Sequence, residues 1–433
     1  MADVTKSIKK TGGDYSTVQA AIDAYSTQAD TGWYKCEIQD SEEYVEDITI
    51  NESVSSPSST HYIWLTAHPD NRHSGVAGTG HARLKQNSIF NIRVYDSYTR
   101  IDWLDITNDR TADYTQGVSI NATTVNSVLV SYCILRNSGG HVLGHNAIQN
   151  LNRAGTMYVD NCVIYGWGRA GVFLGNSTNV TSSIDVDHCT VYDCGRTGDG
   201  ASGAIRMVGD TGDTRTITAY NTIGCGTNGS YTDFSDGNSD TSRLVPSGTV
   251  TWNGSHNLHT SSLTDVDGTD NTTNWQDASS GGATTTTTTA NAVIFSNLTS
   301  GSEDLTLVAA TGAGSNLAVD NGTNRIGSEP DTRQDFSVDI TGATRATTGV
   351  DLGAFVLAGA DPLTLEGFRF RADDGNETGA TWLEAQDVNV VRLPGNNTRL
   401  RALIDATGDP ASQAYKLQWR VKTTGTWTDV EDG

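Results

Sequence analysis

The chain of 433 residues carries 51 Asp and Glu against 28 Lys and Arg, which gives a formal net charge of −23. Such a charge repels nucleic acids and anionic membranes, so we expect neither as a partner. With 46 Gly, seven Pro and an apolar fraction of 36%, the composition favours many short strands joined by turns over helices.

The N-terminal residues predict a strand followed by a helix. No apolar run follows Met1, so we expect neither a signal peptide nor a membrane-spanning segment. Residues 4–8 are β-prone, and residues 15–25 form an amphipathic helical pattern that Asp14 or Ser16 can cap. Stacked strands expose backbone groups at their ends, and we therefore predict that residues 1–30 form an N-terminal cap.

Four apolar, β-prone strings recur with a long period further along the chain. They are residues 132–135, 161–164, 188–191 and 220–223. Their second residues, Cys133, Cys162, Cys189 and Asn221, follow one another at intervals of 29, 27 and 32 residues. A period in this range indicates stacked coils that bury one face against their neighbours. We interpret the recurring cysteines as small buried apolar residues rather than as disulfide or metal ligands.

A resemblance to a known fold family supports this interpretation. Residues 13–22 resemble the N-terminal cap of right-handed parallel β-helix proteins of the pectate-lyase-like group. Residues 303–307, 339–345 and 350–355 are similar to the closing segment of many phage and metagenomic β-helix proteins. The chain as a whole resembles right-handed parallel β-helix proteins of the pectate-lyase-like group. The resemblance implies an all-β fold, with a capping helix followed by a right-handed parallel β-helix over residues 31–360.

The pattern changes after residue 360 to strands that alternate apolar and polar residues, as in a sheet with one buried face. Residues 368–375, 380–382, 399–401 and 415–420 resemble a domain of virion structural proteins of tailed phages. This resemblance implies an immunoglobulin-like β-sandwich over residues 361–433 that lacks its usual last strands. Either a neighbouring chain completes the sheet, or the natural polypeptide continues past Gly433.

Aligning the repeats places an outward column at Asp102, Ser131, Asp160, Asp187 and Ala219. Adjacent coils lie about 4.8 Å apart, so Asp160 and Asp187 become neighbours. Two neighbouring carboxylates raise one pKa or recruit a cation, and their separation is close to that of the pair in retaining glycosidases. They are the candidate catalytic residues, and the alternative is an ordinary solvated surface.

Other residues are candidates for binding. Arg169, Arg196 and Trp167 are candidate glycan contacts, although the arginines could simply pair with the Asp column and Trp167 could pack in the core. Asp265, Asp267 and Asp270 are calcium candidates, against the alternative of a solvated turn. No cofactor other than calcium is indicated.

The resemblances favour a structural protein of a tailed-phage virion, namely a spike, fibre or capsid-associated decoration protein. Its partners would be other virion proteins, bound through the C-terminal domain, and host surface polysaccharide, and it would form a homo-oligomer with the trimer as first candidate. It would assemble in the host bacterial cytoplasm and end in the virion. The alternative is a polysaccharide lyase or glycoside hydrolase of the β-helix group, since the fold alone does not decide function.

Overall fold

The structure is a computed structural model, and its residues fall into two compact units, Met1–Leu357 and Ala358–Gly433. The sequence placed this boundary between residues 360 and 361. The described residues are 3–27, 32–51, 57–78, 80–121, 125–140, 144–151, 154–175, 179–195, 203–208, 212–225, 234–235, 249–259, 276–277, 294–298, 303–308, 318–319, 321–357, 364–374, 379, 381–391, 398–405, 418–419 and 428–429. Among them, no helix has the length and apolarity needed to span a bilayer.

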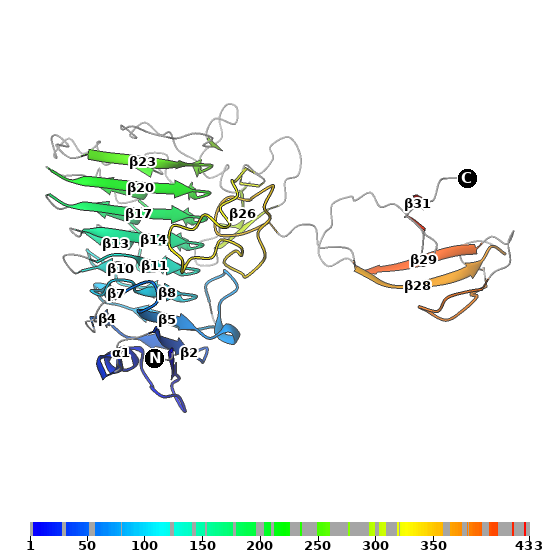
Figure 1. Cartoon of the computed structure of the whole chain (residues 1–433), viewed down its shortest axis with the longest axis horizontal. Helices are drawn as coiled ribbons and strands as arrows, with labels where there is room; N and C mark the ends of the chain where they lie inside the picture. The colour runs from blue at the N-terminus through cyan, green and yellow to red at the C-terminus, as the bar shows by residue number, and fades with distance from the viewer. Residues whose placement is uncertain are drawn as a thin grey trace. The chain divides into compact units, whose positions relative to one another are not determined.

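The first unit confirms the predicted parallel β-solenoid, whose coils stack in chain order (Figure 1). Sheet A contains β1 (Val4–Ile8), β2 (Tyr34–Ile38), β5 (Ile63–Ala67), β8 (Arg100–Asp102), β11 (Val128–Ser131), β14 (Gly155–Asp160), β17 (Thr181–Asp187), β20 (Thr214–Tyr220) and β23 (Thr249–Ser255). Sheet B contains β3 (Glu43–Val45), β6 (Arg83–Gln86), β9 (Asp105–Asn108), β12 (Ile134–Asn137), β15 (Val163–Tyr165), β18 (Thr190–Tyr192), β21 (Ile223–Cys225), β24 (Leu258–His259) and β25 (Gln276–Asp277). Sheet C contains β4 (Ile48–Ile50), β7 (Phe90–Val94), β10 (Gln116–Ile120), β13 (Asn146–Leu151), β16 (Ala170–Gly175), β19 (Gly203–Val208) and β22 (Phe234–Ser235). The predicted right-handedness of the coil stays a prediction.

The register corrects the predicted ladder at its fourth member. Asp187 pairs with Tyr220, so Asn221 stacks on His188. Thr222 therefore stacks on Cys189 and is the fourth member of the ladder. The backbone explains the difference, because the corner residues have left-handed φ values, 49° at both His188 and Asn221. Asn tolerates this conformation better than most residues. Thr222 then occupies the inward position, where its hydroxyl donates to the Tyr220 carbonyl at 2.9 Å.

The cysteine prediction is confirmed, since all six cysteines are free and buried. The thiol of Cys162 lies 3.2 Å from the Asp160 carbonyl and 3.5 Å from the Val130 carbonyl of the preceding coil. Burial raises the pKa of the Cys162 thiol, which keeps it protonated and unreactive. The ladder therefore fills the inner corner between sheets A and B.

One inward position of sheet C holds a polar residue. Asn150 stacks between Ile120 and Leu174 and is fully buried. Neither of its amide atoms has a hydrogen-bond partner in the described part of the chain. Burying an amide without a partner costs roughly 1–3 kcal/mol.

Replacing Asn150 with Val should therefore stabilise the solenoid unit by about 1–2 kcal/mol, because the unpaired amide is removed and apolar surface is buried. Thermal unfolding of the purified chain measures this as an increase in Tm. Asn108→Val is the matched control, since the buried Asn108 amide donates to Asn91 Oδ1 at 2.8 Å and to the Ser88 carbonyl at 3.2 Å. The control should lower Tm, and a lower Tm for Asn150→Val as well would contradict this explanation.

The predicted helix is shorter than expected. Helix α1 spans Val18–Asp23, and a 3₁₀ turn, η1 (Ala24–Thr27), replaces its expected last turn. The Thr17 side chain accepts a hydrogen bond from the Ala20 amide, and the Glu46 carboxylate accepts from the Val18 and Gln19 amides at 3.0 and 2.9 Å. Val18, Ala21 and Ile22 form the buried face, as the spacing predicted. The capping role of the helix stays a prediction.

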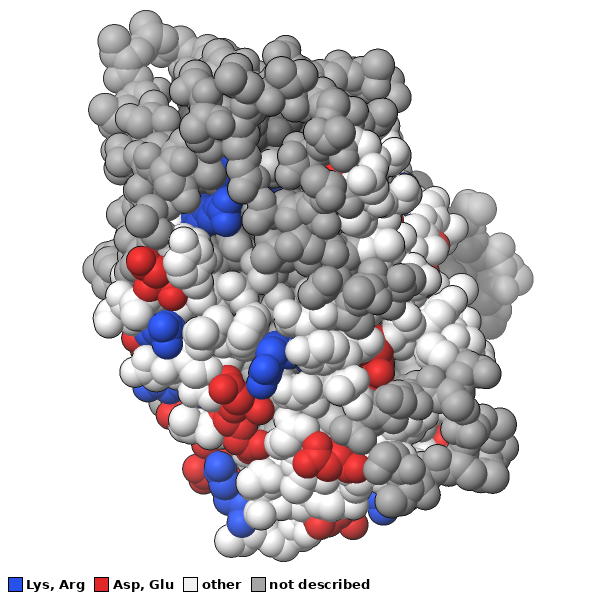
Figure 2. Space-filling model, turned by 90° about the vertical axis from the view of Figure 1, so that its left-hand side faces the viewer, with Lys and Arg blue, Asp and Glu red and all other residues white. Residues whose placement is uncertain are grey.

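A layer outside the coils was not predicted. The described residues 294–298, 303–308, 318–319 and 321–357, which the sequence analysis assigned to the β-helix, include side chains that pack against the outer face of sheet B. Within this layer, β26 (Phe295–Asn297) and β27 (Asp304–Leu307) pair antiparallel with each other beside the coils (Figure 1). We call residues 321–357 the strap. Four outward residues of sheet B are apolar, and they form a second core with this layer: Ile134, Val163, Ile223 and Leu258 pack with Phe295, Leu305, Leu307, Ile340, Leu352 and Phe355. On another face of the molecule, acidic and basic side chains are interspersed over the described coils (Figure 2).

The second unit is described in part. Strands β28 (Thr364–Ala372) and β29 (Thr398–Asp405) pair antiparallel, as do β30 (Gln418–Trp419) and β31 (Thr428–Asp429). The immunoglobulin-like sandwich and its missing strands stay predictions.

Candidate functional site

The predicted column of polar side chains lies at the carboxyl ends of the sheet A strands. Asp102, Ser131, Asp160 and Asp187 are register partners in successive coils. The fifth member is Tyr220 and not Ala219, because Asp187 pairs with Tyr220 and Ala219 is a fully buried partner of Val186. The predicted adjacency of Asp160 and Asp187 is therefore correct.

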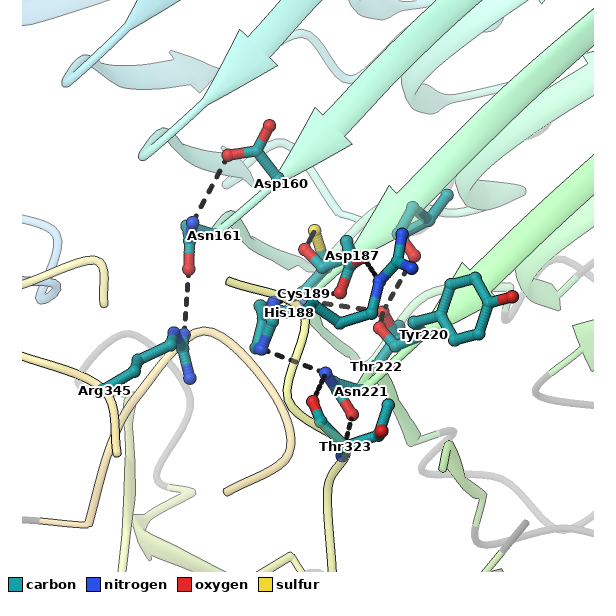
Figure 3. A network of polar contacts seen from close by, with 12 residues as sticks. Asp160, Asn161, Asp187, His188, Cys189, Tyr220, Asn221, Thr222, Thr323 and Arg345 are labelled. Atoms are coloured by element: carbon teal, nitrogen blue, oxygen red, sulfur yellow. Dashed lines mark hydrogen bonds and ion pairs between the residues drawn. The ribbon is translucent and has the colours of Figure 1, made fainter. Parts of the chain in front are cut away.

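The expected solvent exposure of the column is wrong. Asp160 is 0% and Asp187 4% exposed, because the strap lies over them and contributes polar partners. Figure 3 shows the strap on the outer side of these strands, with contacts to the column and to the corner residues beside it. The site is consequently an interface within the chain.

Asp187 has cationic and polar partners. Arg325 of the strap donates from Nε to Asp187 Oδ2 at 2.9 Å, and its guanidinium lies 4.1 Å from the centre of the Tyr220 ring. The ring of His188 lies on the other side, with Nδ1 at 2.9 Å from Asp187 Oδ1. The charge of this carboxylate is therefore compensated within the interface.

The proton on His188 can be assigned from its neighbours. The Thr323 amide donates to Asn221 Oδ1 at 2.8 Å, which fixes the orientation of the Asn221 amide. Asn221 Nδ2 then faces His188 Nε2 at 3.0 Å, so Nε2 is the acceptor. Burial lowers the pKa of His188 to about 4, and the neutral ring consequently carries its proton on Nδ1, beside Asp187.

Asp160 differs from Asp187 because its carboxylate accepts hydrogen bonds from two neutral amides. Gln334 of the strap donates to Oδ1 at 3.0 Å, and Asn161 donates to Oδ2 at 3.3 Å. Burial raises the pKa of Asp160 to about 7, with a smaller contribution from the charge of Asp187. Asp160 is therefore partly protonated at neutral pH.

The corner residues extend the interface. Arg345 of the strap is 3% exposed and donates from Nη2 to Asn161 Oδ1 at 2.8 Å and to the Gly353 and Ala354 carbonyls. The Tyr132 hydroxyl donates to the Asp335 carbonyl. Polar atoms of the strap thus bind successive coils through positions that recur once per coil.

Arg333 fixes the part of the strap that lies over the earliest coils that it contacts. Its guanidinium pairs with Asp331 at 2.7 Å and donates to the Tyr98 and Ser127 carbonyls. The Ser127 hydroxyl donates to the same Asp331 carboxylate at 2.7 Å. The strap therefore spans the coils from Asn221 to Tyr98.

The contacts that this arrangement supplies are to the strap. General acid–base or nucleophilic catalysis needs a group within hydrogen-bond reach of a bound substrate. Here the carboxylates of Asp160 and Asp187 are covered, and their described partners belong to the same chain. The chemistry available is the binding of one chain segment by another.

The candidate glycan and calcium residues are not part of the Asp column. Trp167 is fully buried and donates from Nε1 to the Leu135 carbonyl at 3.1 Å, which leaves no ring face for a sugar. Arg169 is half-buried, with its guanidinium 4.6 Å from the centre of the Phe173 ring on sheet C, away from the Asp column on sheet A. Arg196, Asp265, Asp267 and Asp270 lie outside the described residues. Within the described ranges, no three His, Cys, Asp or Glu side chains are grouped as metal ligands would be.

Sequence reasoning missed the strap residues that contact the column. Arg325, Gln334 and Arg345 contact coil residues 138 to 184 positions earlier in the chain. A signal was present, because arginines are denser within residues 325–345, which contain three of them, than in the rest of the chain.

Comparisons with known proteins relate the chain to others by fold only. No protein-family model matches the chain, and no curated protein matches it. Two solved structures of the pectin methylesterase from Aspergillus niger, in differently deglycosylated forms, are similar. The first has 14% identity and a TM-score of 0.34, and the second 13% and 0.33; each alignment covers 63% of this chain and 84% of the other. At these values the activity of those proteins has no bearing on this chain.

Proposed function

We propose that this chain is a structural protein of a tailed-phage virion, namely a spike, fibre or capsid-associated decoration protein. The observation that carries the proposal is that Asp160 and Asp187 are buried in contacts with the strap. A solenoid whose carboxylates hold its own chain together fits a rigid structural element better than an open catalytic groove. The resemblance of the C-terminal strings to virion proteins points the same way.

The proposal includes the finer features expected from the sequence. The coil is right-handed, α1 caps its N-terminal end, and residues 361–433 form an immunoglobulin-like sandwich that binds other virion proteins. The protein is a homo-oligomer, with the trimer as first candidate, and it assembles in the host bacterial cytoplasm. Host surface polysaccharide is the proposed external partner, and bound calcium is retained as a proposal only for Asp265, Asp267 and Asp270.

Mass spectrometry of purified virions of the encoding phage tests the proposal. We expect peptides from both units, at a copy number that is constant between preparations. Virions that contain no peptide of this chain would overturn it.

The alternative, a polysaccharide lyase or glycoside hydrolase, makes the opposite prediction for purified protein. We expect no products from acidic or neutral polysaccharides, because the carboxylates are covered. The enzyme alternative holds if the native chain depolymerises a glycan and the folded double variant Asp160→Asn/Asp187→Asn does not. Circular dichroism establishes that the variant is folded.

A further inference from the structure

Asn221 joins the strap to the coils through both polar atoms of its side-chain amide. Its Oδ1 accepts from the Thr323 amide at 2.8 Å, and its Nδ2 donates to the Thr323 carbonyl at 2.9 Å. The other hydrogen of Nδ2 faces His188 Nε2 at 3.0 Å. Together these contacts use both hydrogens of Nδ2 and fix the orientation of the amide (Figure 3). We call His188, Asn221 and Thr323 the latch.

The latch requires His188 Nε2 to be an acceptor. A protonated imidazole carries hydrogens on both ring nitrogens, so Nε2 would then point a donor at the Asn221 Nδ2 donor 3.0 Å away. Turning the Asn221 amide by a half rotation would bring Oδ1 to Nε2. It would also set the NH₂ group against the Thr323 amide and the amide oxygen against the Thr323 carbonyl. Protonation of His188 and binding of Thr323 therefore oppose each other.

The groups around His188 keep its ring neutral while the strap is bound. The centre of the ring lies 5.5 Å from that of Phe336, which belongs to the strap. Burial lowers the pKa of His188 to about 4, and the charges of Arg345 and Arg325 of the strap act in the same direction, while Asp187 opposes them. Release of the strap removes Phe336 and both arginines and leaves Asp187 in place. The pKa of His188 should then return to about 6.5, its ordinary value.

We propose that the latch is an acid-sensitive switch, closed at neutral pH and opened by protonation of His188, which releases the start of the strap from the coils. Opening also uncovers Asp187, because Arg325, which donates to this carboxylate at 2.9 Å, lies two residues after Thr323. The open state binds a proton that the closed state lacks, so the ratio of open to closed chains should rise about tenfold per pH unit as pH falls from about 6.5 to about 4. The switch goes beyond the proposed virion role and is tested independently of it.

Hydrogen exchange of the full purified chain, corrected for the intrinsic exchange rate at each pH, tests this inference. From about pH 6.5 to about pH 4, we expect the protection of peptides that cover residues 321–326 to fall on the order of 100-fold relative to the sheet A strands. His188→Asn should abolish this selective fall, because Asn does not titrate. Asn also suits the corner, since Asn161 has the left-handed φ of 50° at the same position one coil earlier.

His73→Gln is the matched control. Burial lowers the pKa of His73 to about 4 as well, but its Nε2 contacts the Tyr132 carbonyl at 2.9 Å and not Asn221. This variant removes an equally buried titratable ring and should keep the selective fall of the wild type.

Asn221→Asp is a second, independent variant of the latch. Its carboxylate accepts both from the Thr323 amide and from a protonated His188 Nε2, so protonation no longer opposes binding of the strap. The selective fall should disappear in this variant too. Thermal unfolding at neutral pH establishes that each variant is folded.

Two results would overturn the inference. Strap protection that stays parallel to that of the sheet A strands from pH 6.5 to pH 4 would show that the latch does not open on its own. A selective fall that both His188→Asn and Asn221→Asp retain would assign the effect to another titratable group.

Discussion

Replacing Arg333 with Met should destabilise the solenoid unit by about 3–5 kcal/mol, the usual cost of removing one member of a buried ion pair. The substitution leaves the Asp331 carboxylate, 6% exposed, without its guanidinium partner. It also removes the donors to the Tyr98 and Ser127 carbonyls. The pKa of Asp331 is lowered because hydrogen bonding and charge from Arg333 outweigh the opposing effect of burial.

Urea unfolding followed by tryptophan fluorescence measures this loss for the solenoid unit. The double variant Asp331→Asn/Arg333→Met is the matched control, since it removes both charges and should be more stable than Arg333→Met alone. A cost below about 1 kcal/mol for Arg333→Met would show that the strap end is weakly bound, since surface pairs contribute about that much.

Asp160→Asn should stabilise the protein above pH 7 and change how its stability depends on pH. The pKa of Asp160 is about 7 in the folded chain, against about 3.9 in an unfolded one. Between these values the folded state keeps a proton that the unfolded state has lost. The contribution of Asp160 to the free energy of unfolding is therefore complete below about pH 4. It is lost as pH rises to about 7, by about 1.4 kcal/mol per pH unit.

Asn imitates the protonated acid, so the variant should lose less stability than the wild type between about pH 4 and pH 8. Burial also raises the pKa of Asp185 to about 6. Asp185 therefore makes stability fall with rising pH in the same direction, and the Asp160→Asn variant keeps this effect. Asp331→Asn is the control of opposite sign, because the lowered pKa of Asp331 supplies stability at neutral pH that is lost in acid. Chemical unfolding at several pH values gives both profiles, and parallel profiles for Asp160→Asn and the wild type would exclude a raised pKa.

The parallel coil could be predicted because its inward positions repeat once per coil. Cys133, Cys162 and Cys189 occupy one such position, and their spacing was sufficient to predict stacked coils. The next coil could not be aligned by apolar similarity, because Thr222 replaces the cysteine and Asn221 precedes it. The left-handed corner conformation decides the register there, and a residue type indicates it only weakly.

The Asp column could be predicted, but its burial could not. Outward direction was inferred correctly from alternation, and exposure was then assumed. The residues that cover Asp160 and Asp187 come from the strap, more than 130 positions later in the chain. Sheet B offered an indication, since Ile134-Leu135 and Val163-Ile164 are continuous apolar pairs, which is typical of strands buried on both faces.

Hydrogen exchange of the strap tests the central claim, that the carboxylate column binds residues 321–357, most directly. The Thr323, Gly353 and Ala354 amides donate to Asn221 and Thr190 of the coils. We predict that peptides covering the strap exchange as slowly as the sheet A strands, and that Arg333→Met accelerates them selectively. Exchange of wild-type strap amides at the rate of an exposed loop would contradict the claim.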